Sequence, residues 1–175
     1  MRKIIIMILV VFVSCTNLYA LDLKVGEKAT VWKFMDSENK IFTMEKWAGK
    51  VLFINYVDPD EKDVNEHVND AMKKASNNDL LKLDLYKGIG IVDCDATWIP
   101  DSLIKSMAGK KAKKFKTVIL FDYDAILRKK WNLKEDASNI ILLDKNRVCR
   151  AIYKDKVTAE ETKKLVELAI KLQNQ

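Results

Sequence analysis

Apolar residues recur along this chain in two spacings, one typical of strands and the other of amphipathic helices. Short apolar runs bounded by polar residues or glycine predict five strands: 51–57, 88–93, 117–121, 139–143 and 147–153. Apolar positions at helical spacing in a charged background predict helices over 64–77, 101–113 and 158–172, with a short helix ending at Trp131. The order indicates an α/β protein.

Local signals add detail to this pattern. Residues 29–33 and 40–43 flank a polar turn and predict an N-terminal hairpin. Thr158-Ala159-Glu160-Glu161 forms a capping box in front of the last helix. In the helix over 101–113, the spacing predicts that Leu103, Ile104 and Met107 are buried.

The first residues of the chain predict export. Met1-Arg2-Lys3 is followed by an apolar run, 4–13, and a small residue at Ala20 offers a cleavage point, so 1–20 is interpreted as a secretory signal. The run is shorter than the roughly 20 residues that span a bilayer, and no later segment is apolar enough, so we expect no membrane span in the mature protein. The alternative is a lipoprotein signal with lipidation at Cys15, which Phe12 disfavours.

The remaining residues, 21–175, contain no repeat or linker and predict one domain in the periplasm or outside the cell. Its net charge is +4, because removal of 1–20 takes two basic residues from a chain of +6. The basic residues gather at Lys110, Lys111, Lys113, Lys114, Lys116, Arg128, Lys129 and Lys130. We interpret them as a solvated helix end, whose lysines suit the helix dipole, rather than as a nucleic-acid site.

Several short segments of the sequence resemble segments of the exported and peroxiredoxin-like branches of the thioredoxin-like proteins. They include Gly26-Glu27-Lys28-Ala29 near the start, 47–55 around the strand at 51–57, and 140–148 in the closing hairpin. Residues 131–133, 143–148, 154–155 and Thr158 resemble more closely the YtfJ family of periplasmic thioredoxin-like proteins, whose biochemical role is not established. The resemblance implies a three-layer thioredoxin-like α/β sandwich with an N-terminal hairpin and one extra strand-helix insertion.

The departures from the redox members of that superfamily concern their active site. Those members have Cys-x-x-Cys after the central strand, where a helix N-terminus lowers the pKa of the first thiol. The corresponding stretch here is 60–64, so Glu61 and Val64 occupy degenerate motif positions and no sulfur is available. Ser138 stands where redox members place a cis-proline, and we expect its peptide bond to be trans because a non-proline cis bond costs about 2.5–4 kcal/mol.

Two cysteines follow the signal segment, Cys94 and Cys149, and neither is part of a motif. In a thioredoxin-like sheet the strand of Cys149 lies at an edge, followed by those of Asn139, Val51 and Gly88. This order separates the two cysteines by roughly 14 Å, whereas a disulfide needs Cα atoms within about 7 Å. We therefore expect two free thiols.

Paired aspartates follow three of the predicted strands and suggest a metal site. The pairs are Asp58 and Asp60, Asp93 and Asp95, and Asp122 and Asp124. Parallel strands end at one edge of a sheet, where the carboxylates could converge on calcium or magnesium. Capping of turns and helices is the alternative, and we favour it because aspartate is common at such positions.

Two single residues have structural and functional interpretations. His67, the only histidine, lacks a neighbouring nucleophile or acid, which favours a surface role over catalysis. Trp98 follows the second aspartate pair and could line a binding cleft, but packing is the commoner role of tryptophan.

Together these features predict an exported, non-redox, thioredoxin-like binding or accessory protein of the cell envelope rather than an enzyme. We expect no cofactor and no nucleic acid, and the sequence leaves the partner open, an envelope protein being one candidate. The first alternative is a thiol-dependent oxidoreductase or peroxidase that uses Cys94, which lies near the end of a strand. The second is a transcriptional regulator that binds nucleic acid through the lysine cluster.

Overall fold

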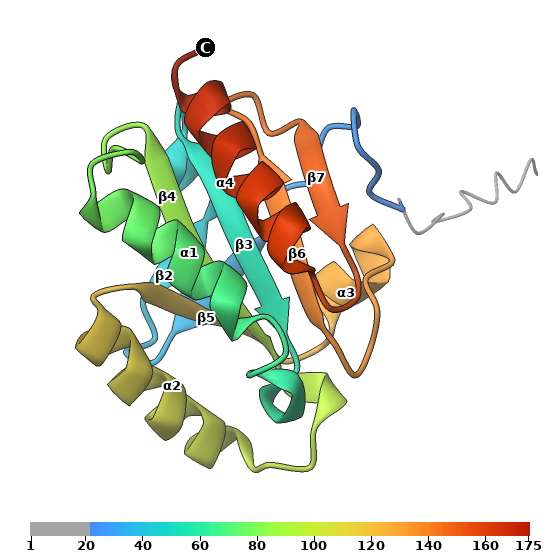
Figure 1. Ribbon diagram of the computed structural model, residues 1–175. Helices are drawn as coiled ribbons and strands as arrows, with labels where there is room; N and C mark the ends of the chain where they lie inside the picture. The colour runs from blue at the N-terminus through green and yellow to red at the C-terminus, as the bar shows by residue number, and fades with distance from the viewer. Residues whose placement is uncertain (1–21) are drawn as a thin grey trace, which may run out of the picture.

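A seven-stranded mixed sheet forms the centre of the computed structural model, which describes residues 22–175 (Figure 1). The predicted signal, 1–20, and Cys15 therefore lie outside the described residues. The strand order is β2-β1-β5-β4-β3-β6-β7. The strands are β1 (Lys33–Asp36), β2 (Ile41–Thr43), β3 (Val51–Val57), β4 (Tyr86–Asp93), β5 (Val118–Asp122), β6 (Ser138–Leu143) and β7 (Cys149–Tyr153).

The three middle strands β3, β4 and β5 are parallel, and the others pair antiparallel with their neighbours. The predicted order of β7, β6, β3 and β4 is confirmed. β3 lies between β4 and β6, and all of its residues except Val57 are buried, as its apolar sequence predicts.

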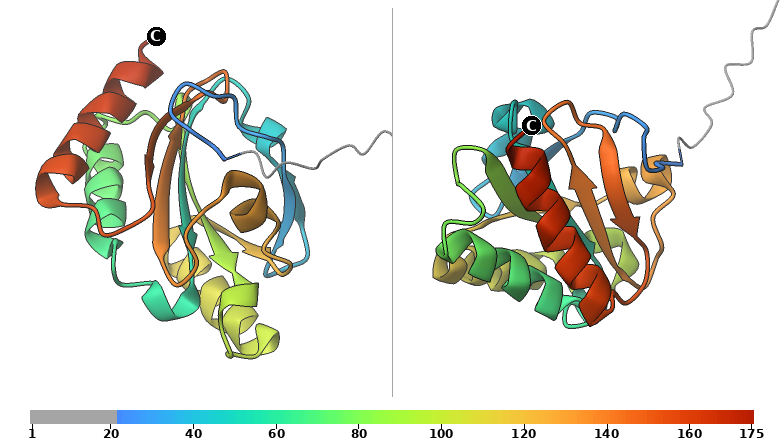
Figure 2. Two further views of the ribbon diagram at one scale, coloured as in Figure 1. Left: turned by 90° about the vertical axis from the view of Figure 1, so that its right-hand side faces the viewer. Right: turned by 45° about the horizontal axis from the view of Figure 1, so that its top comes forward.

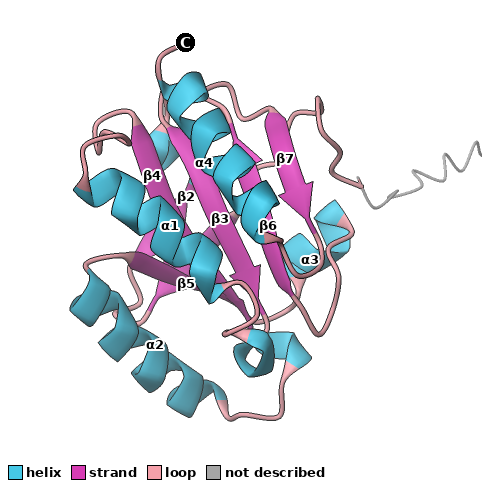
Figure 3. Ribbon diagram, viewed as in Figure 1, coloured by secondary structure: helices cyan, strands magenta, loops and turns pink. Residues whose placement is uncertain are grey.

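Four α-helices and three short 3-10 helices surround the sheet. They are α1 (Glu66–Asn77), α2 (Asp101–Phe115), α3 (Ile126–Trp131) and α4 (Ala159–Gln173), with η1 (Met44–Trp47), η2 (Pro59–Glu61) and η3 (Cys94–Ala96). α1 and α4 lie side by side on one face, and α3 lies on the other (Figures 2 and 3). No helix among residues 22–175 is long and apolar enough to cross a membrane.

Alternate residues of β3 supply two separate cores. Val51 and Phe53 pack with residues of α1 and α4, whereas Leu52, Ile54 and Tyr56 pack with residues of α3 and the N-terminal segment. This alternation follows from the two-residue period of a strand. The result is the predicted three-layer α/β arrangement.

The N-terminal segment differs from its prediction. The first hairpin strand was expected at 29–33, but β1 begins at Lys33. Residues before it pair at the opposite edge of the sheet instead: Gly26 N donates to Cys149 O at 2.8 Å, and Ala29 N donates to Arg147 O at 2.9 Å. The alternation of apolar and polar residues cannot distinguish a hairpin strand from a segment that pairs with β7, because both have an extended backbone.

The prediction that α2 buries Leu103, Ile104 and Met107 is wrong for two of the three. Ile104 is buried, but Leu103 and Met107 are each 51% exposed. The helix approaches the β1–β2 turn at Gly109, where an added Cβ would meet Ser37 Oγ at 2.8 Å. This close approach turns Leu103 and Met107 away from the sheet.

The C-terminal helix begins as predicted. Thr158 Oγ1 accepts a hydrogen bond from Glu161 N at 3.2 Å, and the Glu161 carboxylate accepts one from Thr158 N at 2.8 Å. These reciprocal bonds satisfy two backbone donors that a helix start would otherwise leave free.

Candidate functional site

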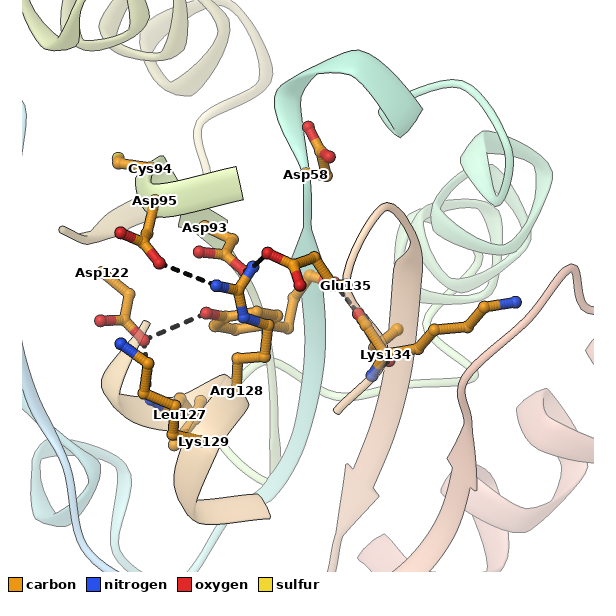
Figure 4. Close-up of polar contacts among 12 residues, drawn as sticks. Asp58, Asp93, Cys94, Asp95, Asp122, Leu127, Arg128, Lys129, Lys134 and Glu135 are labelled. Carbon is orange, nitrogen blue, oxygen red and sulfur yellow. Dashed lines mark hydrogen bonds and ion pairs between the residues drawn. The ribbon is translucent and has the colours of Figure 1, made fainter. Parts of the chain in front are cut away.

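The edge at which β3, β4 and β5 end brings several buried charged side chains together (Figure 4). Asp93 ends β4 and Asp122 ends β5, and the two are register partners. Parallel strands bring their carboxyl ends to one edge, so the sequence-based expectation of adjacent carboxylates is met for this pair.

Arg128 of α3 is the centre of an ion cluster at this edge. Its Nη1 lies 3.0 Å from Asp93 Oδ2 and 2.8 Å from Glu135 Oε1, and its Nη2 lies 2.8 Å from Asp95 Oδ2. The sequence pattern grouped Arg128 with the solvated basic residues, which is wrong, because its side chain is only 10% exposed. Because arginine is strongly polar, a sequence pattern predicts that it lies on the surface. Arg128 is buried because three carboxylates compensate its charge inside the protein.

Asp122 has a different set of partners. Its Oδ1 accepts from Ile126 N at 2.8 Å, and its Oδ2 accepts from Leu127 N at 2.7 Å and from the Tyr56 hydroxyl at 3.1 Å. It therefore caps the first turn of α3 and positions Arg128 for the cluster. Burial and the nearby Asp122 charge raise the pKa of Tyr56, so this hydroxyl stays protonated.

Asp93 is the least satisfied member of the cluster. It is 2% exposed, and its Oδ1 has no hydrogen-bond partner among the described residues. Burial raises the pKa of this carboxyl to about 6, although the Arg128 charge acts in the opposite direction.

Asp58 and Asp60 make hydrogen bonds outside the Arg128 cluster. Asp58 Oδ1 accepts from Asp60 N at 2.8 Å and caps η2, and Asp60 Oδ2 accepts from the Thr97 hydroxyl at 2.7 Å. Asp58 lies apart from the Arg128 cluster in Figure 4, and burial raises its pKa. Asp124 is exposed.

Within 22–175, no group of three or more acidic, histidine or cysteine side chains is placed to hold a metal ion. The Asp58, Asp93 and Asp122 pairs have separate partners, and the shared calcium or magnesium site stays an untested hypothesis. The positive charge between Asp93 and Asp95 is the guanidinium of Arg128.

The region that corresponds to the redox motif is held together by Asn65, a residue that the sequence analysis did not identify. Asn65 is fully buried just before α1; its Nδ2 donates to Ser138 O at 2.7 Å and to Asp155 O at 3.2 Å. Its Oδ1 accepts from Val157 N at 2.9 Å. Asn65 thus joins the start of α1 to β6 and to the segment before α4.

The three degenerate motif positions have ordinary surroundings. Glu61 ends η2, and Val64 is half-buried before α1. Ser138 is buried at the start of β6, where its hydroxyl donates to Asn55 Oδ1 at 3.0 Å. No peptide bond in the described part of the chain is cis, so the predicted trans bond at Ser138 is confirmed.

Cys94 and Cys149 are both free and buried, which confirms the prediction made from strand order. Burial raises the pKa of the Cys94 thiol to about 12 and that of Cys149 to about 11. Their Sγ atoms lie near backbone carbonyls, at 3.8 Å from Val92 O and 3.5 Å from Ala151 O. Among residues 22–175, neither thiol has a cationic partner that would favour a thiolate.

His67 and Trp98 lie on the surface, whereas the other three tryptophans are buried. His67 is exposed, and its Nε2 lies 2.8 Å from Val157 O. Trp32, Trp47 and Trp131 are packed in the core, whereas Trp98 is 100% exposed. The favoured packing role is therefore wrong for Trp98.

Several solved structures with a similar fold are thiol-disulfide proteins. The thioredoxin domain of a thiol-disulfide oxidoreductase from Bacteroides vulgatus is 12% identical, with TM-score 0.60 over 85% of this chain and 99% of that one. A secreted thiol-disulfide isomerase from Corynebacterium glutamicum is 12% identical, with TM-score 0.62 over 83% and 85%. Reduced 2-Cys peroxiredoxin of Plasmodium vivax is 17% identical, with TM-score 0.59 over 86% and 96%.

At these identities the structural matches establish the thioredoxin-like fold and nothing about activity. No curated protein sequence matches the chain. A family model described as "bacterial protein of unknown function (YtfJ_HI0045)" matches residues 22–172. The chain therefore belongs to the YtfJ family, as its C-terminal sequence segments indicated, and has a thioredoxin-like fold.

Proposed function

We propose that this protein is an exported, non-redox binding or accessory protein of the cell envelope, periplasmic or secreted. Its thioredoxin-like domain would be released by cleavage of residues 1–20. The observation that carries the proposal is the environment of Asn65: the chain uses a buried amide, bonded to three backbone groups, beside the place where redox relatives need two cysteines.

The surroundings of the remaining thiols support the non-redox assignment. Thiol-disulfide exchange and peroxide reduction both require an accessible thiolate. Burial raises the pKa of Cys94 to about 12, so this thiol is protonated at neutral pH. Its side chain is buried beside Asp93, whose negative charge further opposes ionisation. These features argue against the alternative of an enzyme that uses Cys94.

The buried ion cluster argues for a rigid binding platform rather than a second catalytic centre. Arg128 is paired on both terminal nitrogens, and Asp122 accepts three hydrogen bonds. Most of these groups have their partners inside the protein, which leaves few of them free to bind substrate; Asp93 Oδ1 is the exception, without a hydrogen-bond partner among the described residues. The cluster instead holds the C-terminal ends of the parallel strands in one arrangement.

The test of this assignment is an activity assay on the purified protein. Insulin-disulfide reduction and hydroperoxide consumption in the presence of dithiothreitol should not exceed the rate of the reductant alone. A thioredoxin run in parallel shows that the assay responds. Activity that disappears in Cys94→Ser but persists in Cys149→Ser would overturn the non-redox assignment.

Export requires a separate measurement, because the signal segment lies outside the described residues. N-terminal sequencing of protein purified from cells should return Leu21 or a neighbouring residue, from the envelope or culture fraction. An intact Met1 in the cytoplasmic fraction would contradict export and favour the regulator alternative. A lipid on Cys15 would contradict cleavage after Ala20.

A further inference from the structure

The outward side of α2 and the loop before it expose large apolar side chains to water. Trp98 is 100% exposed, and Leu103 and Met107 are each 51% exposed. Single exposed apolar residues are common on protein surfaces. A completely exposed tryptophan that is followed closely by two further exposed apolar side chains is uncommon. Such a group of side chains is typical of a binding surface.

Helical spacing continues this surface as a basic stripe. Leu103, Met107, Lys110 and Lys114 follow one another at intervals of three or four residues, so they lie along one side of α2. All four are exposed. The apolar half of the stripe therefore leads directly into a positively charged half.

The lysines of this helix form an excess of positive charge. Residues 101–116 contain six lysines and a single acidic residue, Asp101. Lys111 and Lys113 are paired with Glu66 and Glu38, at 3.3 and 3.2 Å. Lys110 and Lys114, on the outward stripe, have no ion-pair partner within residues 22–175. Their charge is available to an anionic ligand.

The shape of the surface distinguishes among anionic ligands. α2 lies at the edge of the molecule (Figure 1), and the outer side of a helix is convex. A cavity of about 150 Å³ beside α2 is lined from its inner side by Gly109, Ala112 and Lys113, and no residue of the outward stripe contributes to it. A protein partner needs complementary pockets for such side chains. A bilayer interface does not, because lipids rearrange around protruding groups.

We infer that α2 and the loop before it bind anionic lipid membranes. Trp98, Leu103 and Met107 enter the boundary between headgroups and acyl chains, where tryptophan is favoured. Lys110 and Lys114 contact lipid phosphates. The protein lies on the membrane through this surface, a mode of binding that is separate from thiol chemistry and that needs no membrane-spanning helix.

The chain from Leu21 to Gln175 is the material for the test, because it contains every described strand and helix and lacks the apolar run 4–13, which would bind lipid by itself. It is mixed with vesicles of phosphatidylcholine alone or of phosphatidylcholine with phosphatidylglycerol, and sedimented. We expect co-sedimentation with the phosphatidylglycerol vesicles only, weakening as salt is added. Tryptophan emission should shift to the blue on binding, because the other three tryptophans are already buried.

Variants assign the binding to this surface. Lys110→Gln with Lys114→Gln should weaken binding about 25-fold, at about fivefold for each lysine. Lys163→Gln with Lys171→Gln is the matched control, since it removes the same charge from exposed positions of α4. Trp98→Ala should weaken binding about tenfold, and Trp98→Phe should retain binding but lose the emission shift. All these positions are exposed, so melting temperatures should not change.

Three results would overturn the inference. They are absence of binding to phosphatidylglycerol vesicles, equal effects of the α2 and α4 lysine pairs, and saturable binding of polyglutamate without vesicle binding, which would assign the surface to an acidic protein. None of these results bears on the non-redox assignment, which the thiol assays test separately.

Discussion

Asp93 and Arg128 form a buried ion pair, with 3.0 Å between Oδ2 and Nη1, that joins the end of β4 to α3. Neither residue is distinctive in the sequence, where Asp93 resembles a strand-ending aspartate and Arg128 resembles a surface charge. Their association explains why a fully charged guanidinium lies inside the protein.

Replacement of Arg128 should be strongly destabilising. Arg128→Met leaves Asp93 buried without its counter-ion, and loss of one partner of a buried pair costs about 3–5 kcal/mol. The unfolding free energy from urea titration measures the loss. Lys130→Met, at an exposed position of the same helix, should change it by less than about 0.5 kcal/mol. A similar small change in both variants would show that the pair contributes little.

The unfolding free energy should depend on pH through Asp93. Its native pKa, about 6, lies above the ordinary aspartate value, so the native state binds this proton more tightly than the unfolded chain. The Asp93 contribution to stability is therefore full below about pH 4 and decreases as the pH rises to about 6, by up to about 3 kcal/mol. Asp93→Asn should remove this slope. The unfolding free energies of the variant and the wild type are measured from pH 4 to 7. As the pH rises, the wild type should lose stability relative to the variant. A difference that stays constant with pH would contradict the raised pKa of Asp93.

Asn65 should be essential to the packing around α1. Asn65→Ala removes three hydrogen bonds and leaves two backbone carbonyls and the Val157 amide without their partner. We expect a loss of about 2–4 kcal/mol in the unfolding free energy and faster hydrogen exchange at Val157 N. Asn69→Ala is the control, since Asn69 makes one long bond, 3.4 Å, to the backbone of its own helix segment. Equal losses in the two variants would contradict the role of Asn65.

The two cysteines should react only when the protein unfolds. Both thiols are buried with raised pKa values, so alkylation at neutral pH should be slow in the native state and complete in urea. Mass spectrometry of the unreduced monomer, alkylated in urea, should show modification of both Cys94 and Cys149. Rapid native alkylation of Cys94 would indicate an accessible thiolate, and a disulfide within the chain would contradict the strand order.

Local patterns predicted the strands and helices because these elements depend on short-range properties. The apolar run at 51–57 coincides with β3, and the capping box at Thr158 marks the start of α4. Family resemblance supplied the order of the strands, which in turn predicted that Cys94 and Cys149 are free. The absence of a cysteine pair at 60–64 could also be read directly from the chain.

Only the tertiary structure decided which side chains are inside. Arg128 is buried because carboxylates from β4, η3 and the loop after α3 surround it, and Asn65 is buried because backbone groups distant in sequence need its amide. Leu103 and Met107 face outward because the approach of Gly109 to Ser37 sets the rotation of α2. Periodicity predicts that a helix has an apolar side, but contacts between residues far apart in sequence determine which side meets the protein and which remains in solvent.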